Sequence, residues 1–424
     1  MRKKIVQKAM ALCLAMLLAV SAAVAGQAAK PAITKDCPPI VFVHGLGGWG
    51  QGAWIDLLMP HWGMQAGSVR KELNQRGYEA HAVSMGPVSS TWDRACELYA
   101  QLAGSKVDYG EAHAAAHGHN RYGKTYRKPM VKNWSAEHPV ALVGHSFGGA
   151  TSRLFTQLCE EGSKAERDAN QSRMSPLFSG DLGGRVIAVV TLGSPHNGST
   201  ASEAYLNEGG ESADGGIAGS MMKILRVGMV VPLVEQIYPF RLGHFGLAMR
   251  NFYRKPVSTW KAVDKFLEQK DGAAYELTID GAKDVNGGIE CQPNVYYFSF
   301  YADATEADAD GNRVPKDFVW DMFKGTSAAM GKRRPAFTTP GGVLIDDEWL
   351  PNDGLVNVIS GHHPFAEPYK EYDAGAVECG IWQVMPIVTN FDHIDFGGSM
   401  QKKGGADGFL DFHLNIAKMM EELG

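Results

Sequence analysis

The sequence predicts an α/β fold in which a mostly parallel central sheet is covered by helices on both faces. Short apolar runs of β type recur along the chain, and segments of helical character lie between several of them. This alternation is typical of such a sheet. The expected strands cover residues 40–43, 80–84, 140–143, 186–192, 295–301 and 382–388, and the clearest helical segments are 67–76, 91–103 and 150–161.

The first 25 residues have the pattern of a secretory signal peptide. Four basic residues precede an apolar stretch from 9 to 20, and small residues follow, ending in Ala23-Val24-Ala25. The apolar stretch is shorter than the ~20 residues that a membrane span needs. We therefore expect cleavage near Ala25, export of residues 26–424 as one domain, and no stable insertion into a membrane.

The charge and cysteine content exclude two further classes. The formal net charge is −5, and loss of the four basic residues of the leader would change it to −9. Nucleic-acid binding needs clustered basic residues, so we expect no such partner. Five cysteines would remain, at positions 37, 96, 159, 291 and 379. Five is an odd number and is sparse for a chain of this length, so we expect no disulfide framework, although a single bridge remains possible.

The most specific motif is Gly144-His145-Ser146-Phe147-Gly148, which stands between an apolar run and a helical segment. This strand–turn–helix setting is that of the nucleophile elbow of α/β-hydrolases. Such a turn strains the serine and brings backbone very close to it, and only glycine lacks the side chain that would collide there. Ser146 is therefore the candidate nucleophile, and an ordinary glycine-rich turn is the alternative.

A nucleophilic serine needs a histidine base and a carboxylate that orients it, and in α/β-hydrolases both follow the serine in the chain. Asp353 and His393 suit these roles, because each lies in a loop that comes after a β-like run. Surface aspartates and helix-capping histidines are common, so spacing alone leaves the choice open. The candidate acids are Asp346, Asp347, Glu348 and Asp353, and the candidate bases are His362, His363, His393 and His413.

Acyl transfer also needs N–H donors for the developing oxyanion. One should be the backbone N–H of Phe147, the residue after the nucleophile, and the other comes from a loop after an early strand. The apolar run 40–43 leads into the glycine-rich loop His44-Gly45-Leu46-Gly47-Gly48, which makes the N–H of Leu46 the second candidate. A plain β-turn is the alternative for this loop.

Three stretches interrupt the strand–helix alternation and are interpreted as insertions rather than separate domains. Residues 104–135 are rich in histidine and aromatic residues, and residues 302–340 begin acidic and end basic. The third stretch, residues 199–250, holds many apolar residues between 221 and 234, too many for a free surface helix. We expect a lid over the serine there, with a buried core helix as the alternative.

The chain resembles the family I.5 bacterial lipases, secreted enzymes of Gram-positive bacteria that include thermoalkalophilic and staphylococcal members. The resemblance runs from about Pro39 to the C-terminus. The motifs that carry it are HGLGGWG (44–50), GPVSSTWDRACELYAQL (86–102), VDYGEAHAAAHGHNRYGKTY (107–126), GHSFGG (144–149), SPHNGS (194–199), WLPNDGLVN (349–357) and DHIDF (392–396).

The resemblance implies an α/β-hydrolase that cleaves carboxylic esters, with triacylglycerols as the expected substrates. It also implies Asp353, in the N-D-G turn, and His393, in the D-H segment, as the partners of Ser146. A short-chain carboxylesterase or an aliphatic polyester hydrolase would carry the same residues. Two further interpretations of the same fold are an enzyme that transfers the acyl group to an alcohol and a non-catalytic binding protein.

The family carries a zinc site in an extra subdomain, which corresponds here to residues 88–135. From the residues alone, Asp93, His113 and His119 are a plausible set of one carboxylate and two imidazoles, with His117 a competitor. The resemblance implies Asp93, His113 and His119 as the family's ligands. The family's fourth ligand is an aspartate in an F-K-L-D-Q-W-G-L stretch, and Gly243 stands at that place here. We therefore expect His244, the next residue, to be the fourth ligand of a structural zinc ion.

Calcium has weaker support. The family pattern places carboxylates just after the catalytic histidine; Asp395 fits the first, but residues 397–400 supply no second acid. The acidic segment 306–312 looks like half of an EF-hand loop, without its leading Asp and its Glu at position twelve. A solvated acidic loop is the preferred interpretation of that segment.

Overall fold

A computed structural model describes residues 37–170, 172–203, 237–247, 269–399 and 407–423, together with residues 261, 263, 265 and 266. The expected signal peptide and the apolar stretch 221–234, expected as a lid, lie outside the described residues.

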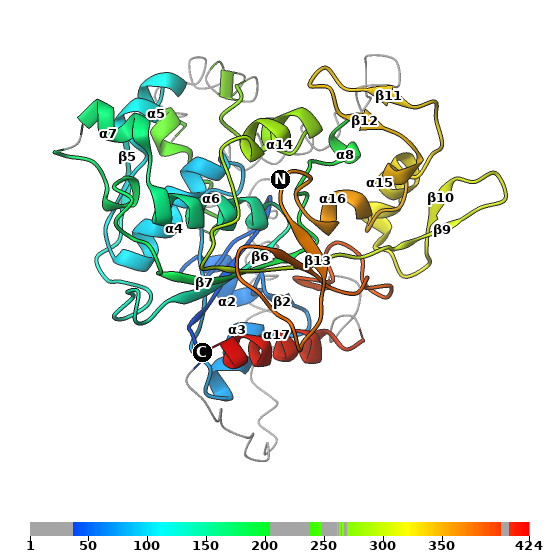
Figure 1. Cartoon of the computed structure of the whole chain (residues 1–424), viewed down its shortest axis with the longest axis horizontal. Helices are drawn as coiled ribbons and strands as arrows, with labels where there is room; N and C mark the ends of the chain where they lie inside the picture. Colours follow the sequence, from blue (N-terminus) through cyan, green and yellow to red (C-terminus); the bar gives the residue numbers. More distant parts are fainter. Residues whose placement is uncertain are drawn as a thin grey trace, which may run out of the picture.

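The core is a seven-stranded sheet in which every neighbouring pair of strands is parallel (Figure 1). The strand order is β13-β14-β8-β7-β6-β1-β3, so β3 and β13 form the two edges. The six predicted strands all belong to this sheet, which confirms the predicted fold class. The strands are β1 (Ile40–Val43), β3 (Ala80–Ala82), β6 (Val140–His145), β7 (Val186–Leu192), β8 (Tyr296–Phe300), β13 (Tyr369–Glu371) and β14 (Trp382–Val384).

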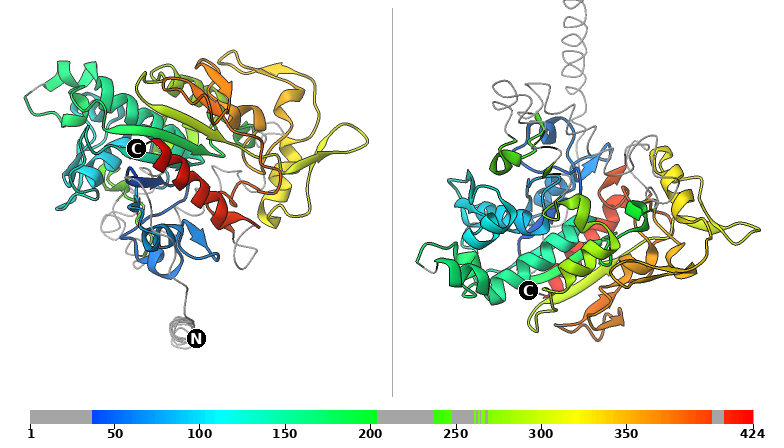
Figure 2. Two further views of the ribbon diagram at one scale, coloured as in Figure 1. Left: turned by 60° about the horizontal axis from the view of Figure 1, so that its bottom comes forward. Right: turned by 90° about the horizontal axis from the view of Figure 1, so that it is seen from above.

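Side chains alternate between the two faces of each strand, and each face is buried under helices. Val41 and Val43 of β1 pack with residues of α4 (Thr91–Ala103) and α6 (Phe147–Glu161). Ile40 and Phe42 pack on the opposite side with residues of α3 (Val69–Gln75) and α17 (Phe409–Leu423). Figure 2 shows α17 in red crossing that second face. The apolar runs are therefore covered on both sides.

Local signals set the limits of these helices. The Ser68 side chain accepts a hydrogen bond from the N–H of Lys71 at the start of α3, and the Ser90 side chain accepts one from Asp93 at the start of α4. Gly104 ends α4 in the left-handed conformation, at φ 70°. By contrast, α6 has no side-chain cap and begins directly after Ser146.

The interruptions of the alternation have structure of their own. Residues 104–135 hold β4 (Lys106–Asp108), α5 (Glu111–His117) and β5 (Tyr122–Thr125). Residues 302–340 hold α15 (Asp321–Met330) and a projecting antiparallel hairpin, β9 (Thr305–Ala307) with β10 (Arg313–Pro315) (Figure 1). The remaining elements are α2 (Trp54–Leu58), β2 (Gly63–Met64), α7 (Lys164–Asn170), η1 (Pro176–Phe178), α8 (Thr200–Glu203), η2 (Leu242–Phe245), α13 (Ala273–Glu276), α14 (Ile279–Asn286), β11 (Phe337–Thr338), β12 (Leu344–Ile345), η3 (Asp347–Trp349), α16 (Val358–His362) and β15 (Gly398–Ser399).

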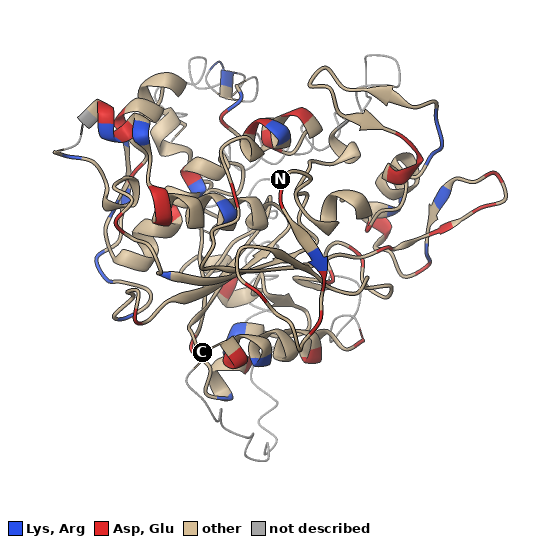
Figure 3. Ribbon diagram, in the orientation of Figure 1, with Lys and Arg blue, Asp and Glu red and all other residues tan. Residues whose placement is uncertain are grey.

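Three further expectations concern the cysteines, a membrane-spanning helix and the distribution of charge. The five described cysteines are all free thiols, so none of them forms the single bridge that the sequence left open. Within the described ranges, no helix combines the length and apolar character that crossing a bilayer requires. Acidic and basic side chains are interspersed over the elements (Figure 3).

Candidate active site and metal centre

Ser146 occupies a sharp turn between the end of β6 and the start of α6. Its backbone has φ 55° and ψ −130°, a conformation that residues other than glycine rarely adopt. Its N–H donates to the carbonyl oxygen of Leu192, at the end of the neighbouring strand β7, over 2.9 Å. The side chain is nearly buried, with 8% of its surface exposed. The turn thus holds Ser146 beyond the carboxyl ends of two adjacent strands.

Crowding around the turn explains its glycines. A Cβ atom on Gly144 would lie 2.7 Å from the carbonyl carbon of Gly148, and one on Gly148 would lie 2.0 Å from the carbonyl oxygen of Val43. Both approaches involve backbone atoms, which cannot move aside as a flexible side chain can. The strained serine therefore depends on glycine at both positions.

The loop after β1 lies against the serine. A Cβ atom on Gly45 would lie 2.6 Å from the Cβ of Ser146 and 3.1 Å from its Oγ. Among the described residues, the backbone N–H groups of Leu46 and Phe147 form no main-chain hydrogen bond. Leu46 follows Gly45 in the loop that contacts Ser146, and Phe147, the first residue of α6, directly follows the serine.

Arg94, which the sequence analysis did not single out, ties this loop to the body of the fold. Its guanidinium is fully buried and donates to the carbonyl oxygens of His44 and Gly86, and its Nε donates to the Thr151 hydroxyl over 2.9 Å. His44 accepts from the N–H of Met85 through Nε2, so its Nδ1–H donates to Gly45. Burial and the Arg94 charge keep the pKa of His44 well below its usual range. The loop is therefore held by a neutral imidazole and a buried cation.

Asp353 and His393 form a buried pair. The Nδ1–H of His393 donates to Oδ2 of Asp353 over 2.9 Å, which leaves Nε2 of the imidazole as the basic nitrogen. The other oxygen, Oδ1, accepts the N–H groups of Leu355 and Val356 over 3.0 and 2.7 Å. The His393 N–H also donates to the Asp353 carbonyl oxygen, over 2.8 Å. The carboxylate orients the ring and is itself fixed by the N-D-G turn.

His145 links the elbow to this pair. Its Nε2–H donates to the carbonyl oxygen of His393 over 2.8 Å, and the two rings pack with centroids 4.9 Å apart. Burial, followed by the charges of His393 and His61, keeps the pKa of His145 well below its usual range, so the ring is neutral. The residue before the candidate nucleophile thus holds the backbone of the candidate base.

The other candidate acids and bases have structural contacts of their own. Asp346 caps η3 by accepting from the N–H of Glu348, and Asp347 pairs with Arg333. Nδ1 of His362 lies 2.7 Å from Nδ1 of His363. The fourth candidate base, His413, is buried on α17, where its Nε2–H donates to Phe396 over 2.9 Å. None of these four contacts involves Asp353 or His393.

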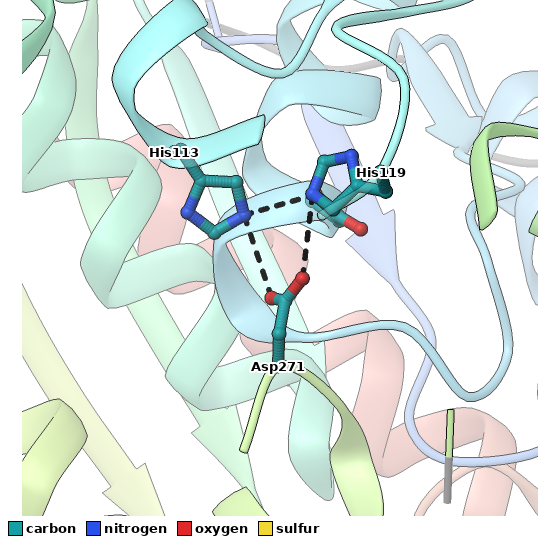
Figure 4. A group of neighbouring side chains, drawn as sticks. His113, His119 and Asp271 are labelled. Carbon is teal, nitrogen blue, oxygen red and sulfur yellow. Dashed lines mark ion pairs between the residues drawn. The ribbon is translucent and has the colours of Figure 1, made fainter. Parts of the chain in front are cut away.

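A second group of side chains could hold a metal ion. Asp93 from α4, His113 from α5, His119 from the loop after it, and Asp271 each offer one ligand atom, and these atoms all lie within 4.8 Å of one another. Figure 4 shows the two imidazoles and Asp271 pointing toward one another. Nε2 of His113 lies 3.4 Å from an oxygen of Asp93 and 3.4 Å from one of Asp271.

The atoms of this group fit a small tetrahedral cation. Ligand bonds of ~2.05 Å in a tetrahedron place the ligand atoms ~3.3 Å apart. The four separations between an imidazole nitrogen and a carboxylate oxygen, measured to Oδ1 of Asp93 and to both oxygens of Asp271, are 3.4 to 4.0 Å. One nitrogen of each histidine and one oxygen of each aspartate are buried without a hydrogen-bond partner in the described structure, namely Asp93 Oδ1, His113 Nε2, His119 Nε2 and Asp271 Oδ2. Buried polar atoms are rarely left unsatisfied, so a bound cation accounts for all four.

The group contains Asp271, whereas His244, the expected fourth ligand, is not one of its four members. Nε2 of His244 lies 2.7 Å from Oδ2 of Asp93, the oxygen that does not face the other ligands. An imidazole that donates to a ligating carboxylate fixes its orientation. His117 packs against the ring of His113 but is not part of the group. No local pattern marks Asp271, because its partners lie more than 150 residues away in the chain.

The electrostatics of the group follow from its two carboxylates. Burial alone would lower the pKa of His113, but the nearby carboxylates of Asp271 and Asp93 outweigh burial and raise it to about 9. Burial also lowers the pKa of His119, but the carboxylates of Asp271 and Asp93 outweigh burial and raise this pKa above its usual value. Without metal, protons therefore occupy nitrogen atoms that a cation would otherwise bind.

The positions associated with calcium have other contacts. Oδ2 of Asp395 accepts the N–H of Asp392 over 3.1 Å. In the acidic segment, both oxygens of Asp308 accept hydrogen bonds from Asn312, within the turn between β9 and β10. Most residues of this turn are exposed to solvent.

Comparison with known proteins places this arrangement in context. The family model described as "Lipase-like, C-terminal domain" matches residues 36–420. Lipase 1 of Staphylococcus aureus is 34% identical over 390 residues, which cover 87% of this chain and 52% of that protein. The chain spans about half the length of the curated relatives it matches.

Two solved structures are similar over nearly their full length. The lipase of Staphylococcus hyicus has a TM-score of 0.79 and 30% identity, covering 94% of this chain and 98% of that one. EstA from Clostridium botulinum has a TM-score of 0.76 and 33% identity, covering 92% and 89%.

Substitutions should distinguish a metal ligand from a residue that only orients a ligand. We expect Asp271→Ala to lose its bound divalent metal, because the site would keep only three ligands. We expect His244→Ala to keep near-stoichiometric metal but to bind it about 10–100-fold more weakly. Plasma mass spectrometry of dialysed protein, followed by a chelator titration, measures both. Full metal retention by Asp271→Ala together with loss in His244→Ala would restore the sequence-based ligand set.

Proton competition should make metal affinity depend on pH. Since the pKa of His113 is raised to about 9 in the metal-free protein, this proton must leave before the metal binds. The apparent affinity should therefore rise between pH 6 and 9, by about tenfold per pH unit for each proton released, and level off above pH 9. Competition against a chromophoric chelator of known affinity at each pH checks this. An affinity that does not change over that range would contradict the proposed ligand set.

Proposed function

The chain belongs to the family of lipase-like C-terminal domains, and on this premise we propose that it is a secreted serine ester hydrolase acting on triacylglycerols. The observation that carries the proposal is the hydrogen-bonded pair of Asp353 and His393, whose backbone is joined to the Ser146 turn through His145. The lipase relatives support the substrate class. The basic and apolar leader supports secretion.

In the proposed mechanism, Oγ of Ser146 attacks the ester carbonyl carbon while Nε2 of His393 takes its proton. Asp353 orients the ring and stabilises the imidazolium. The negative charge that develops on the carbonyl oxygen is stabilised by the N–H groups of Leu46 and Phe147. The tetrahedral intermediate then collapses, and the alcohol leaves with the proton from His393.

The second half of the cycle repeats these roles with water. His393 removes a proton from a water molecule that attacks the acyl-enzyme, and the new tetrahedral intermediate releases the fatty acid. The proton then returns to Oγ of Ser146. The Nδ1–H bond to Asp353 is required in both halves, because it keeps Nε2 directed at the serine and its substrate.

We propose that the metal is zinc and that its role is structural. Two imidazole nitrogens and two carboxylate oxygens in a closed tetrahedral set are ligands that zinc accepts. When bound, zinc would neutralise the two buried aspartates and join α4, α5 and the segment that carries Asp271. We further propose that residues 26–424 form one hydrolase domain, with residues 88–135 as its zinc-binding insertion.

Kinetics on a series of esters test the activity. We expect Ser146→Ala to lose at least about 10⁴-fold in kcat on p-nitrophenyl esters from C2 to C18, because the nucleophile is removed. Ser152→Ala is a matched control: this buried serine lies on the same helix, and among the described residues its hydroxyl donates only to the Gly148 carbonyl. Its kcat should stay within a few-fold of wild type.

Assays on emulsified glycerides, run beside the p-nitrophenyl ester series, identify the substrate class. Hydrolysis of emulsified long-chain glycerides supports a triacylglycerol lipase, whereas activity confined to soluble short esters would make the protein a carboxylesterase. Undiminished hydrolysis by Ser146→Ala would refute the serine mechanism.

His145 provides a separate test of how His393 is positioned. Replacement by Phe removes the hydrogen bond to the His393 carbonyl, whose loss costs about 1 kcal/mol. We expect kcat to fall by about fivefold with KM little changed, and His145→Gln, which keeps a donor, to recover part of the loss. Thermal unfolding of both variants controls for stability. Equal kcat in wild type and His145→Phe would show that the contact does not position the base.

A further inference from the structure

A basic cleft lies over the outer edge of strand β3, away from the serine. Its volume is about 880 Å³, within the range of small-molecule sites. Its walls come from α3, β3, the end of α4, β5 and the segment 126–130. Five cationic side chains line it: Arg70, Lys71, Lys124, Lys128 and Arg241. We propose that this cleft binds an anion that carries a phosphate group.

The charge of the lining opposes that of the chain. The chain carries a formal net charge of −5, yet none of the described residues that line the cleft is Asp or Glu. Within the described ranges, Arg70, Lys71 and Lys128 form no ion pair, and Nζ of Lys124 contacts only the ring of Tyr126. Cations that gather in one concave site without partners produce a strong local positive potential.

Three carboxylates lie near the cleft without lining it. Glu79 pairs with His81 of the lining, over 2.9 Å, and not with one of the five cations. Asp56 is close enough for Arg70 and Lys71 to oppose the rise that burial causes in its pKa. Oε2 of Glu97 lies 3.9 Å from Nε of Arg241, but the glutamate already accepts the N–H of Gly86 and the hydroxyl of Tyr109. None of these three carboxylates therefore neutralises the set of five cations.

Arg241 shows that the cleft is a built site rather than a chance gathering of surface charge. Its side chain is nine-tenths buried, and its backbone is held in the left-handed region at φ 58°. One arm of the guanidinium donates to the Tyr126 hydroxyl, while Nε is buried and has no hydrogen-bond partner in the described structure. A fixed, desolvated guanidinium with an unused donor is suited to bind an anionic oxygen.

Tyr126 supports the same arrangement. Nζ of Lys124 lies 5.0 Å from its ring centroid, and the guanidinium carbon of Arg241 lies 5.8 Å from it. Burial and the Arg241 charge lower the pKa of Lys124, so the two cations repel each other where they stand. An anion between them would relieve this repulsion. The ring fixes both cations at the position where the anion would bind.

Phosphate is the chemical class that the donors fit. Its oxygens accept paired bonds from guanidinium groups and single bonds from ammonium groups. The volume exceeds what inorganic phosphate fills, so the cleft could also hold the glycerol phosphate of a lipid headgroup. The lining contains none of Ser146, Asp353 or His393, although Gln51 and Gly52 continue the loop that carries Leu46. The inference does not depend on the proposed hydrolase activity.

The test uses charge reversal at two exposed lysines. In Lys71→Glu/Lys128→Glu, two exposed cations of the cleft become anions. The matched control is Lys164→Glu/Lys418→Glu, which makes the same change in net charge at exposed positions outside the cleft. Thermal unfolding of both variants confirms that each is folded. Isothermal titration with inorganic phosphate is the first measurement, and flotation with phosphatidylglycerol or phosphatidylcholine vesicles is the second.

We expect wild type and the control variant to bind at least one probe, and the cleft variant to bind it at least about tenfold more weakly. Phosphate binding without vesicle binding would identify a free phosphate compound as the ligand. Capture by phosphatidylglycerol but not phosphatidylcholine vesicles would identify a lipid headgroup. Absence of binding to both probes, or an equal loss in the two variants, would overturn the proposal.

Discussion

The strained turn at Ser146 is the constraint on which the rest of the site depends. The turn can hold Ser146 at φ 55° because Gly45, Gly144 and Gly148 leave room where a side chain would collide with neighbouring atoms. The same crowding brings Gly45 against the serine and so places the loop after β1. The carbonyl oxygen of Leu192 accepts a hydrogen bond from the Ser146 N–H, which aligns the turn with β7. The elbow thus organises the loops of three neighbouring strands.

Contacts far from the serine keep that arrangement in register. Arg94 lies on α4, one residue after Asp93 of the metal group, and its guanidinium bonds the carbonyl oxygen of His44 in the loop beside Ser146. One helix therefore contributes both to the metal centre and to the loop that carries a predicted oxyanion donor. On this account, an ion bound by Asp93 and Asp271 would stiffen α4 and, through Arg94, the loop next to the serine.

Sequence patterns predicted the parts of this protein whose signals are local. Six strands were recognised because buried parallel strands are continuous apolar runs, whereas the edge strand β13, with sequence Tyr-Lys-Glu, lacks that signature. The turn at Ser146 was recognised from its glycines. Asp271 was missed, since only the three-dimensional fold brings it to His113 and His119. Spacing predicts His244 as a ligand, whereas in the structure its imidazole contacts Asp93 and lies outside the group; spacing cannot distinguish a ligand from a side chain that contacts one.

The central claim is that Ser146 is made reactive by the pair of His393 and Asp353. Covalent labelling tests it most directly: the protein is incubated with an alkyl organophosphonate, digested, and the modified peptide is identified by mass spectrometry. The account predicts a single adduct on Ser146, formed much more slowly in Asp353→Asn and His393→Ala. An unlabelled Ser146 in active protein, or labelling at an unchanged rate in both variants, would contradict it.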